Sequence, residues 1–535
     1  MTDGSPRAKQ GKPGGSLEQL IKALSDPGIY PGHPAHVAVR QTHASCVFLT
    51  ESDAYKLKKP VKLEFLDYST LRRRSFMCRR EVELNRRLAP DVYLGVEPLT
   101  SGRGGALQIG GGGRVVNYLV HMRRLPDEAM LSSLLGDNAA GEPEVRRVAR
   151  RIADFHATTL AVPAAFGSPS VLWRNADENL RTVRAKETAL VFREMAAEVE
   201  AFTRAFLGSR RALIRERAAN GRVRDGHGDL RCEHVYLYDG KLAIIDCVEF
   251  SRRFRFADVA LDLAFLTMDL TASGYPDMTD ILVDEYERSS GDRIGALLDY
   301  FSCYRAMVRA KVALVRAAEA EFSRREREQA RAEAARDLYT ALRFARGDRR
   351  PILALVSGLP GSGKTTVAGL AAQVIAARVI SADRERKRLG GLGPHEHREE
   401  AYSAGLYRPE MNTRVYGALI DAASDAVARG RSVVLDATYR RRADRLAVGE
   451  VARRLGAHLV IIECTAPESV IRKRLERRLA ADDAWSDATW ETYLRQRNEF
   501  EPPDATERPN VVRLHSDRGS DAQLRELLSH LVRVS

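Results

Sequence analysis

The sequence predicts a chain of two domains, an α+β domain followed by an α/β domain, and three observations support this. Residues 35–63 alternate apolar and polar side chains, which is typical of antiparallel strands, and a helical segment follows them. Beyond residue 350, β-rich runs are separated by helical segments, the pattern of a parallel sheet with crossover helices. The length of 535 residues exceeds that of one ordinary domain, and no internal repeat relates the halves.

The first domain is expected over residues 17–346, after a flexible tail of Gly, Pro, Ser and Lys at residues 1–16. A small lobe, residues 17–122, contains the alternating strands, a helix in residues 69–90 that stops at Pro90, and further strands around a glycine-rich loop. A mostly helical large lobe follows at residues 123–346. It ends in one long helical stretch from Tyr304 to about Arg346.

The second domain is expected over residues 350–535. Its strands are predicted in the runs "ILALVSGLPGSGKTT", "ARVISAD", "SVVLDAT" and "HLVIIEC". Helical segments separate these runs, so the sheet should be parallel with crossover helices.

Composition and charge indicate a soluble chain that binds an anionic ligand. Lys and Arg number 85 against 72 Asp and Glu, a formal net charge of +13, which nucleotides would satisfy. No apolar run approaches the roughly 18–20 residues of a membrane span, and the N-terminus lacks the apolar core of a signal peptide. We therefore expect a cytoplasmic protein with no membrane partner. Six cysteines without a CxxC pair predict free thiols.

A phosphate-binding loop is predicted in "SGLPGSGKTT", residues 357–366. Its glycines let successive backbone N–H groups turn toward phosphate, the lysine adds positive charge, and the threonine hydroxyl can ligate Mg²⁺. The predicted nucleotide-binding residues are Gly358, Gly361, Ser362, Gly363, Lys364, Thr365 and Thr366.

Three further features of the second domain resemble phage polynucleotide kinase, zeta toxins and gluconate kinase. Asp383 and Arg386 form a D-x-x-R pattern after a strand, and the resemblance implies that Asp383 is the base for the acceptor hydroxyl. Asp436 at another strand end resembles the family's Walker-B-like carboxylate, which would hold the metal through water or touch the acceptor. The stretch "VIRKRLERRLAADDAWSDA" resembles the family's lid, in which Arg474 and Arg478 would face the transferred phosphate.

The stretches "HGDLRCEHVYL" (residues 227–237) and "AIIDCVEF" resemble aminoglycoside phosphotransferases and other protein-kinase-like folds. The resemblance covers most of residues 35–330 and implies a two-lobe kinase domain, with Asp229 as the base and Asp246 as the Mg²⁺ ligand. One position departs from the family pattern: His234 stands where that pattern has the Asn that ligates a second metal. His234 can coordinate a metal weakly, donate to phosphate, or mark an inactive kinase.

The small lobe should supply a lysine for the nucleotide phosphates and a helix glutamate to hold it. Strand alternation places Lys56 and Lys58 on one face, so the pattern leaves both open, with Lys56 preferred. Their partner is Glu81, with Glu83 as the alternative. The strand "YLVHMRRLP" resembles the kinase hinge, whose backbone at Val120 to Met122 would meet adenine.

Other segments, among them "FLDYSTLRRRSF" and "DVALDLAFLTMDL", resemble a bacterial family of phosphotransferase-like proteins often fused to such a P-loop domain. These resemblances favour a bifunctional phosphotransferase that uses ATP, with GTP as an alternative, and Mg²⁺, and that phosphorylates a hydroxyl of a small molecule such as an aminoglycoside or sugar. A second hypothesis is a C-terminal kinase for 5′-hydroxyl RNA or DNA with a regulatory N-terminal domain. A third is a nucleotide-driven switch without an acceptor. The sequence indicates no oligomeric state.

Overall fold

The computed structural model describes residues 16–42, 44–62, 66–102, 104–187, 189–320, 322–391, 408–479 and 489–535, with the backbone alone for residues 478 and 479. The chain divides into two compact units. Unit 1 comprises Met1–Gly167, Arg217–Leu266 and Arg288–Ser290, and unit 2 comprises Ser168–Glu216, Thr267–Glu287 and Gly291–Ser535. None of the helices in the described ranges is both long and apolar enough to span a bilayer.

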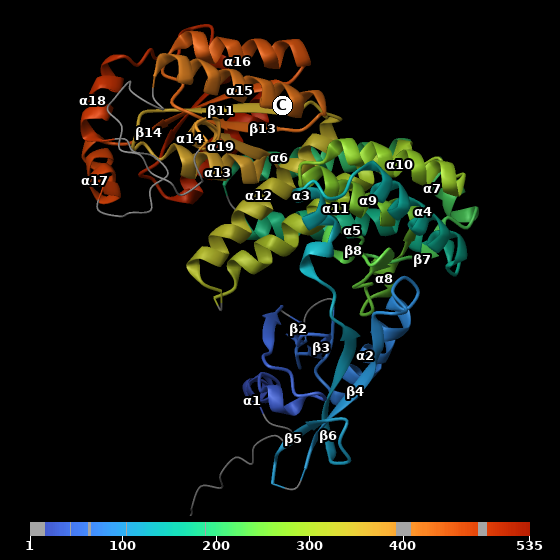
Figure 1. Ribbon diagram of the computed structural model, residues 1–535. Coiled ribbons are helices and arrows are strands. Elements are labelled where there is room, and N and C mark those ends of the chain that lie inside the picture. The colour runs from blue at the N-terminus through green and yellow to red at the C-terminus, as the bar shows by residue number, and fades with distance from the viewer. Residues whose placement is uncertain are drawn as a thin grey trace, which may run out of the picture. The chain divides into compact units, whose positions relative to one another are not determined.

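The described part of unit 1 contains an antiparallel sheet of six strands in the order β1-β2-β3-β6-β4-β5. The strands are β1 (Ala38–Gln41), β2 (Ser45–Leu49), β3 (Asp53–Lys58), β4 (Tyr93–Ser101), β5 (Leu107–Ile109) and β6 (Arg114–Arg123). Helix α2 (Leu71–Asn85) packs on β4 and β6 (Figure 1). The strands that the alternating pattern predicts in residues 35–63 are confirmed as β1, β2 and β3.

In the small lobe, the start of the first helix and the end of the second helix differ from the prediction. Ser16, assigned to the tail, caps α1 (Leu17–Leu24) through a capping box with Gln19, while residues 1–15 lie outside the described residues. Helix α2 ends at Asn85, before Pro90. The Asn85 side chain donates to the carbonyl of Glu81 and accepts from the backbone N–H of Cys247. It therefore joins the end of α2 to a loop that is distant in the sequence.

The rest of unit 1 contains two short antiparallel hairpins and several helices. Strand β7 (Val223–Asp225) pairs with β10 (Phe256–Asp258), and β8 (Val235–Tyr238) pairs with β9 (Lys241–Ile244). The helices and 3₁₀ turns of this part include η2 (Asp127–Ala129), α3 (Leu131–Gly136), α4 (Glu142–Thr158), η4 (Cys232–His234) and α8 (Arg252–Arg255). Asp229 lies between β7 and β8, and Asp246 lies just after β9.

Unit 2 contains a parallel sheet with strand order β12-β13-β11-β14-β15. Its strands are β11 (Ile352–Ser357), β12 (Arg378–Ser381), β13 (Val433–Asp436), β14 (His458–Thr465) and β15 (Val511–His515). Helices α13 (Lys364–Val374) and α19 (Ser520–Val534) lie on one side of the sheet and α15 (Pro409–Ala428) and α16 (Arg442–Leu455) on the other (Figure 1). The remaining described helices of this part are α14 (Ala382–Leu389), α17 (Glu468–Leu479) and α18 (Trp490–Asn498).

The predicted parallel sheet with crossover helices is confirmed, and the four predicted strands are β11, β12, β13 and β14. Strand β15 was not predicted. Its five residues, "VVRLH", form a short edge strand whose register with β14 depends on tertiary packing. The apolar strand β11 is buried along its whole length, as expected for the centre of a parallel sheet.

The stretch predicted as helical from Tyr304 to about Arg346 does form helices, but two helices occupy it. Helix α11 (Gly295–Ala318) ends with Glu319 as its C-cap, and α12 (Arg324–Arg346) begins at a capping box between Ser323 and Glu326. The S-x-x-E spacing that starts α12 is visible in the sequence and marks a helix N-terminus. The two helices pack against each other.

Helices before residue 346 belong to the same compact unit as the parallel sheet. They include α5 (Pro169–Lys186), α6 (Leu190–Ser209), α11 and α12, while residues of α7 (Arg211–Ala219), α9 (Val259–Ala272) and α10 (Pro276–Ser290) are divided between the two units. Helix α12 contacts both α13 and α19. The domain ranges 17–346 and 350–535 therefore stay predictions.

Candidate active sites

The loop that carries Asp229 is anchored by the buried carboxylate of Asp262. The backbone N–H groups of His227 and Gly228 each donate to this carboxylate at 2.7 Å, and Nε2 of His156 lies 3.1 Å from it. Burial raises the pKa of Asp262, but the contacts with His156 and His227 outweigh burial and hold the pKa below its ordinary value. Asp262 is therefore an ionised anchor for the loop.

His227 fixes the same loop to the residues after β9. Its Nε2 lies 3.0 Å from the carbonyl oxygen of Ile245, and the backbone N–H of Asp229 donates to its Nδ1 at 3.3 Å. A carbonyl only accepts, so Nε2 carries the proton and the ring is neutral. Burial lowers the pKa of His227 to about 4.

Acid should loosen this loop. The pKa of His227 falls from 6.5 in the unfolded chain to about 4 when folded, so the unfolded state binds the proton first and stability falls as the pH drops through this window. A shift of this size corresponds to about 3 kcal/mol when complete. Hydrogen exchange of residues 223–248, corrected for intrinsic pH dependence, should rise toward about pH 5 in the wild type and much less in His227→Gln. The same pH response in both proteins would refute this role.

Asp246 has a left-handed backbone conformation, with φ of 64°, which is uncommon for a residue other than glycine. Its backbone N–H donates to the hydroxyl of Tyr93 at 3.2 Å. The next N–H, of Cys247, donates to Asn85 at 2.8 Å. Contacts from the small lobe thus hold the strained turn that presents the Asp246 carboxylate.

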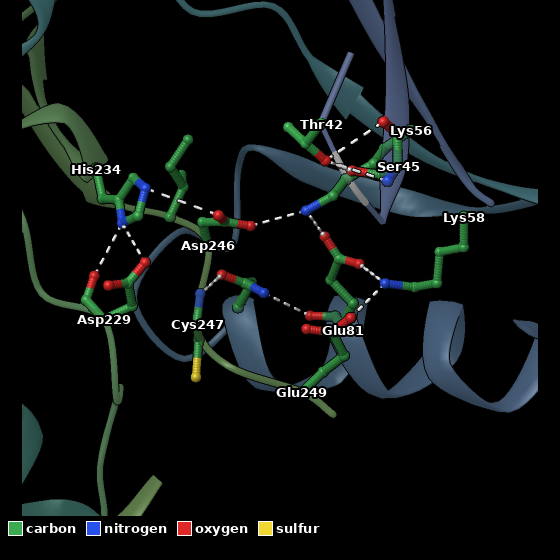
Figure 2. Close-up of polar contacts among 12 residues, drawn as sticks. Thr42, Ser45, Lys56, Lys58, Glu81, Asp229, His234, Asp246, Cys247 and Glu249 are labelled. Atoms are coloured by element: carbon green, nitrogen blue, oxygen red, sulfur yellow. Dashed lines mark hydrogen bonds and ion pairs between the residues drawn. The ribbon is translucent and has the colours of Figure 1, made fainter. Parts of the chain in front are cut away.

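Figure 2 shows the Lys56 side chain between two carboxylates that come from different elements. Its Nζ lies 2.8 Å from Glu81 of α2 and 2.8 Å from Asp246. Burial lowers the pKa of Lys56, but Asp246 and Glu81 raise it well above its ordinary value. Burial raises the pKa of Asp246, and Lys56 and His234 reverse this, leaving it below its ordinary value. The site is therefore held in its charged form.

Lys58 lies on the same face of β3 but is fully enclosed. Its Nζ lies 2.5 Å from Glu81 and pairs with Glu249, which also accepts from the hydroxyl of Tyr68 at 2.5 Å. Only 1% of Lys58 is exposed, so it forms a buried support for Glu81. The alternative glutamate, Glu83, pairs with Arg80 on the exposed side of α2.

Two matched variants separate the roles of the lysines. Lys56→Met keeps the Lys58–Glu81 pair and should mainly weaken nucleotide binding at the N-terminal site. Lys58→Met leaves Glu249 buried without its cation and should lower stability by about 3 kcal/mol. Thermal unfolding and binding of a fluorescent ATP analogue, both in a Lys364→Ala background, measure the two effects. If Lys58→Met weakens binding without loss of stability, Lys58 is the phosphate ligand.

Asp229, His234 and Asp246 form a cluster suited to a divalent cation. One potential ligand atom from each lies within 4.8 Å of the others, and Figure 2 shows His234 between the two aspartates. Two carboxylates this close favour a bound cation. The donor set fits a metal that accompanies nucleotide phosphates.

The adenine contact predicted for Val120 to Met122 is not available in this arrangement. Val120 pairs with Lys56 of β3 on one side and Val96 of β4 on the other, and Met122 likewise has partners on both strands. β6 is thus a central strand, whose backbone groups serve the sheet. Both side chains are buried in the core of the small lobe.

The predicted phosphate loop connects β11 to α13, which begins at Lys364. Gly361 and Gly363 have φ of 76° and 93°, in the left-handed region that favours glycine. A Cβ at Gly358 would lie 2.5 Å from the carbonyl oxygen of Cys464, and one at Gly363 would lie 2.8 Å from Ser516. Glycine is therefore required at these positions by backbone geometry and by close packing. Ser362 is buried within the same loop.

Thr365, at the C-terminal end of this loop, contacts Asp436, the other residue predicted to bind metal in this domain. The Thr365 hydroxyl donates to Asp436 at 2.9 Å, and Asp436 is the last residue of β13. Lys364 donates to the carbonyl of Leu359 at 3.0 Å, while Thr366 is exposed on the first turn of α13. Burial raises the pKa of Asp436, although Lys364 and the Thr365 hydroxyl act in the opposite direction. These oxygen donors fit Mg²⁺.

Asp383 lies in the first turn of α14, just after β12. Arg386 donates to Asp383 at 2.9 Å and to Asn412 of α15 at 3.0 Å. Arg386 is buried and so positions the partly exposed Asp383 carboxylate. Ser381 of β12 pairs with Asp436 of β13, so Asp383, two residues beyond Ser381, lies at the same end of the sheet as Asp436, and its charge raises the pKa of Asp436.

Arg474 of α17 reaches the phosphate loop. Its guanidinium donates to the carbonyl of Gly361 at 3.3 Å and to the Ser516 hydroxyl at 2.7 Å. The role predicted for Arg474 in facing phosphate stays a prediction. Arg478, one turn further along α17, has a side chain outside the described residues.

Several residues that hold these sites were not predicted. Asp262, Tyr93, Asn85 and the Lys58–Glu249 pair all orient a predicted residue from elsewhere in the chain. Asp262 lies in "DVALDLAFLTMDL", one of the segments that resemble the phosphotransferase-like family, so this resemblance was the available signal for it. The other contacts have no local signature.

Residues 70–297 match the phosphotransferase enzyme family, and residues 353–503 match an AAA domain. The chain is also 34% identical over 475 residues to the uncharacterized protein Rv2004c of Mycobacterium tuberculosis, covering 87% of this chain and 91% of that protein. The same values hold for the uncharacterized protein Mb2027c of Mycobacterium bovis. This chain belongs to the Rv2004c family. It joins a phosphotransferase domain with a P-loop kinase domain, so it is a phosphotransferase with nucleotide-binding domains.

Two solved structures are similar to parts of this member of the Rv2004c family. The GDP and kanamycin complex of APH(2″)-IIia is 13% identical and covers 61% of this chain and 98% of its own, with a TM-score of 0.38. A gluconokinase from Sinorhizobium meliloti 1021 is 20% identical and covers 35% of this chain and 94% of its own, with a TM-score of 0.26.

Proposed function

We propose that the protein is a bifunctional ATP-dependent phosphotransferase, in which each half transfers the γ-phosphate to a hydroxyl of a small molecule. One observation supports the proposal: each half contains a lysine and two carboxylates, for which we propose the roles of phosphate ligand, metal ligand and base. In the N-terminal site these are Lys56, Asp246 and Asp229. In the C-terminal site they are Lys364, Asp436 and Asp383.

The chemistry assigned to these residues follows from their charges. The acceptor oxygen attacks the γ-phosphorus, its proton passes to Asp229 or Asp383, and the bond to the ADP oxygen breaks. Lys56, held by Glu81, and Lys364 neutralise phosphate oxygens. A divalent cation held by Asp246, or by Thr365 and Asp436, would supply further charge to the phosphates.

Nucleic acid is the second candidate acceptor, at the C-terminal site. The D-x-x-R pair and the net charge of +13 favour it. A nucleic-acid kinase would show affinity for short 5′-hydroxyl RNA that falls steeply with salt, because phosphate contacts release counterions.

The test is transfer of labelled γ-phosphate by the full-length protein to aminoglycosides, sugars, nucleosides and 5′-hydroxyl RNA. The proposal expects a labelled small molecule whose label depends on Asp229 or on Lys364. Label on RNA alone would favour the second candidate. ATP hydrolysis without any labelled acceptor would favour a nucleotide-driven switch and contradict the proposal.

A further inference from the structure

His234 gives the N-terminal site a donor that the C-terminal site lacks. We propose that the N-terminal site takes a first-row transition-metal cation such as Mn²⁺ in preference to Mg²⁺, with Nε2 of His234 as a ligand beside Asp246. This inference rests on the proposed nucleotide chemistry of that site. It concerns which cation the site selects.

The contacts of His234 determine which ring nitrogen can bind a metal. Nδ1 lies 2.8 Å from the backbone carbonyl of Asp229, and Nη2 of Arg231 lies 3.1 Å from Nε2. The carbonyl only accepts and the guanidinium only donates, so the proton is on Nδ1 and the lone pair is on Nε2. A hydrogen bond from the outer nitrogen to a carbonyl is the arrangement that orients metal-ligating histidines.

The lone pair of His234 faces the metal-binding carboxylate. Nε2 lies 3.7 Å from Oδ2 of Asp246, a separation that two ligands of one cation can have. The imidazole is buried, with 9% of the side chain exposed, so its position is set by the protein. Figure 2 shows the ring pointing to Asp246 on one side and Asp229 on the other.

Imidazole nitrogen distinguishes Mg²⁺ from transition metals. Mg²⁺ is a hard cation that prefers oxygen ligands, whereas transition-metal cations also bind nitrogen. Mn²⁺ accepts carboxylate and phosphate oxygens as Mg²⁺ does, so it suits a mixed site of the Asp246 carboxylate, one imidazole and nucleotide phosphate. The C-terminal pair of Thr365 and Asp436 offers oxygen alone. The two halves of one chain should therefore differ in metal preference.

Arg231 shares the site and must be accounted for. Its guanidinium contacts Nε2 of His234, lies 3.3 Å from Asp229 and pairs with the half-exposed Glu233. A cation on Nε2 replaces the Arg231 contact with His234. The pair with Glu233 at the edge of the site gives the guanidinium a partner after this exchange.

The test is electron spin echo spectroscopy of full-length protein with MnCl₂ and ADP, in the wild type, His234→Asn and His36→Asn. A directly bound imidazole produces nitrogen modulation of the Mn²⁺ signal. We expect this modulation in the wild type and in His36→Asn, whose histidine is exposed, and its loss in His234→Asn. The modulation should persist in Lys364→Ala, which disables the C-terminal site. His234→Asn should also lower the preference for Mn²⁺ over Mg²⁺ by at least about tenfold, measured by competition.

The outcomes separate the inference from the proposed function. Bound Mn²⁺ without nitrogen modulation in the wild type overturns the inference and leaves the phosphotransferase intact. Modulation that survives in a folded His234→Asn variant also overturns it, and the wild-type spectrum decides the matter if that variant does not fold. If the wild type binds a single ADP and Lys364→Ala binds neither ADP nor Mn²⁺, the N-terminal nucleotide site itself is refuted, and the inference with it.

Discussion

Asp229→Asn should reduce phosphate transfer by the N-terminal site by about 100-fold or more, because asparagine cannot accept the acceptor proton. The amide has nearly the size of the carboxylate, and the loop keeps its anchors at Asp262 and Ile245. Nucleotide binding should therefore persist while transfer is lost. Labelled transfer and binding of a fluorescent ATP analogue in a Lys364→Ala background measure the two effects separately.

Asp239→Asn is a matched control for this variant. Asp239 lies in the exposed turn between β8 and β9 with φ of 46°, where asparagine is as well tolerated as aspartate. Transfer by this variant should equal that of the wild type. Unchanged transfer in Asp229→Asn would mean that Asp229 is not the base or that transfer occurs only at the C-terminal site.

Lys364→Ala should lower nucleotide affinity at the C-terminal site by about 100-fold, because the phosphates lose a charged donor at the start of α13. The backbone of the loop should be unaffected, since its shape depends on Gly358, Gly361 and Gly363. Calorimetric titration with a non-hydrolysable ATP analogue should show two sites in the wild type and one in the variant.

Lys186→Ala is the control for this experiment, because Lys186 is exposed at the end of α5. It should retain both nucleotide sites. Two sites of unchanged affinity in Lys364→Ala would refute the assignment of the phosphate loop. Loss of both sites would mean that nucleotide binding in the two halves is coupled.

The division between what sequence and structure revealed is clearest at Lys56 and Lys58. Alternation along a strand predicts that both side chains share one face, and both do contact Glu81. The choice between them depends on what faces each lysine. Asp246 forms an ion pair with Lys56. Lys58 is enclosed by Glu249 and by Tyr68, which donates a hydrogen bond to Glu249. Asp246 and Glu249 lie roughly 190 residues further along the chain than the lysines, so no local sequence pattern links them to Lys56 and Lys58.

The sequence by itself determined the phosphate loop, the parallel sheet around it and the loop bearing Asp229, because each depends on residues close together in the chain. Backbone torsion, strand alternation and helix capping act over a few residues, so short motifs carry this information. Only the tertiary structure decided the anchor at Asp262, the buried Lys58–Glu249 pair, the central position of β6 and the orientation of His234 toward Asp246. These depend on packing between distant segments, where burial and charge pairing set which side chains meet.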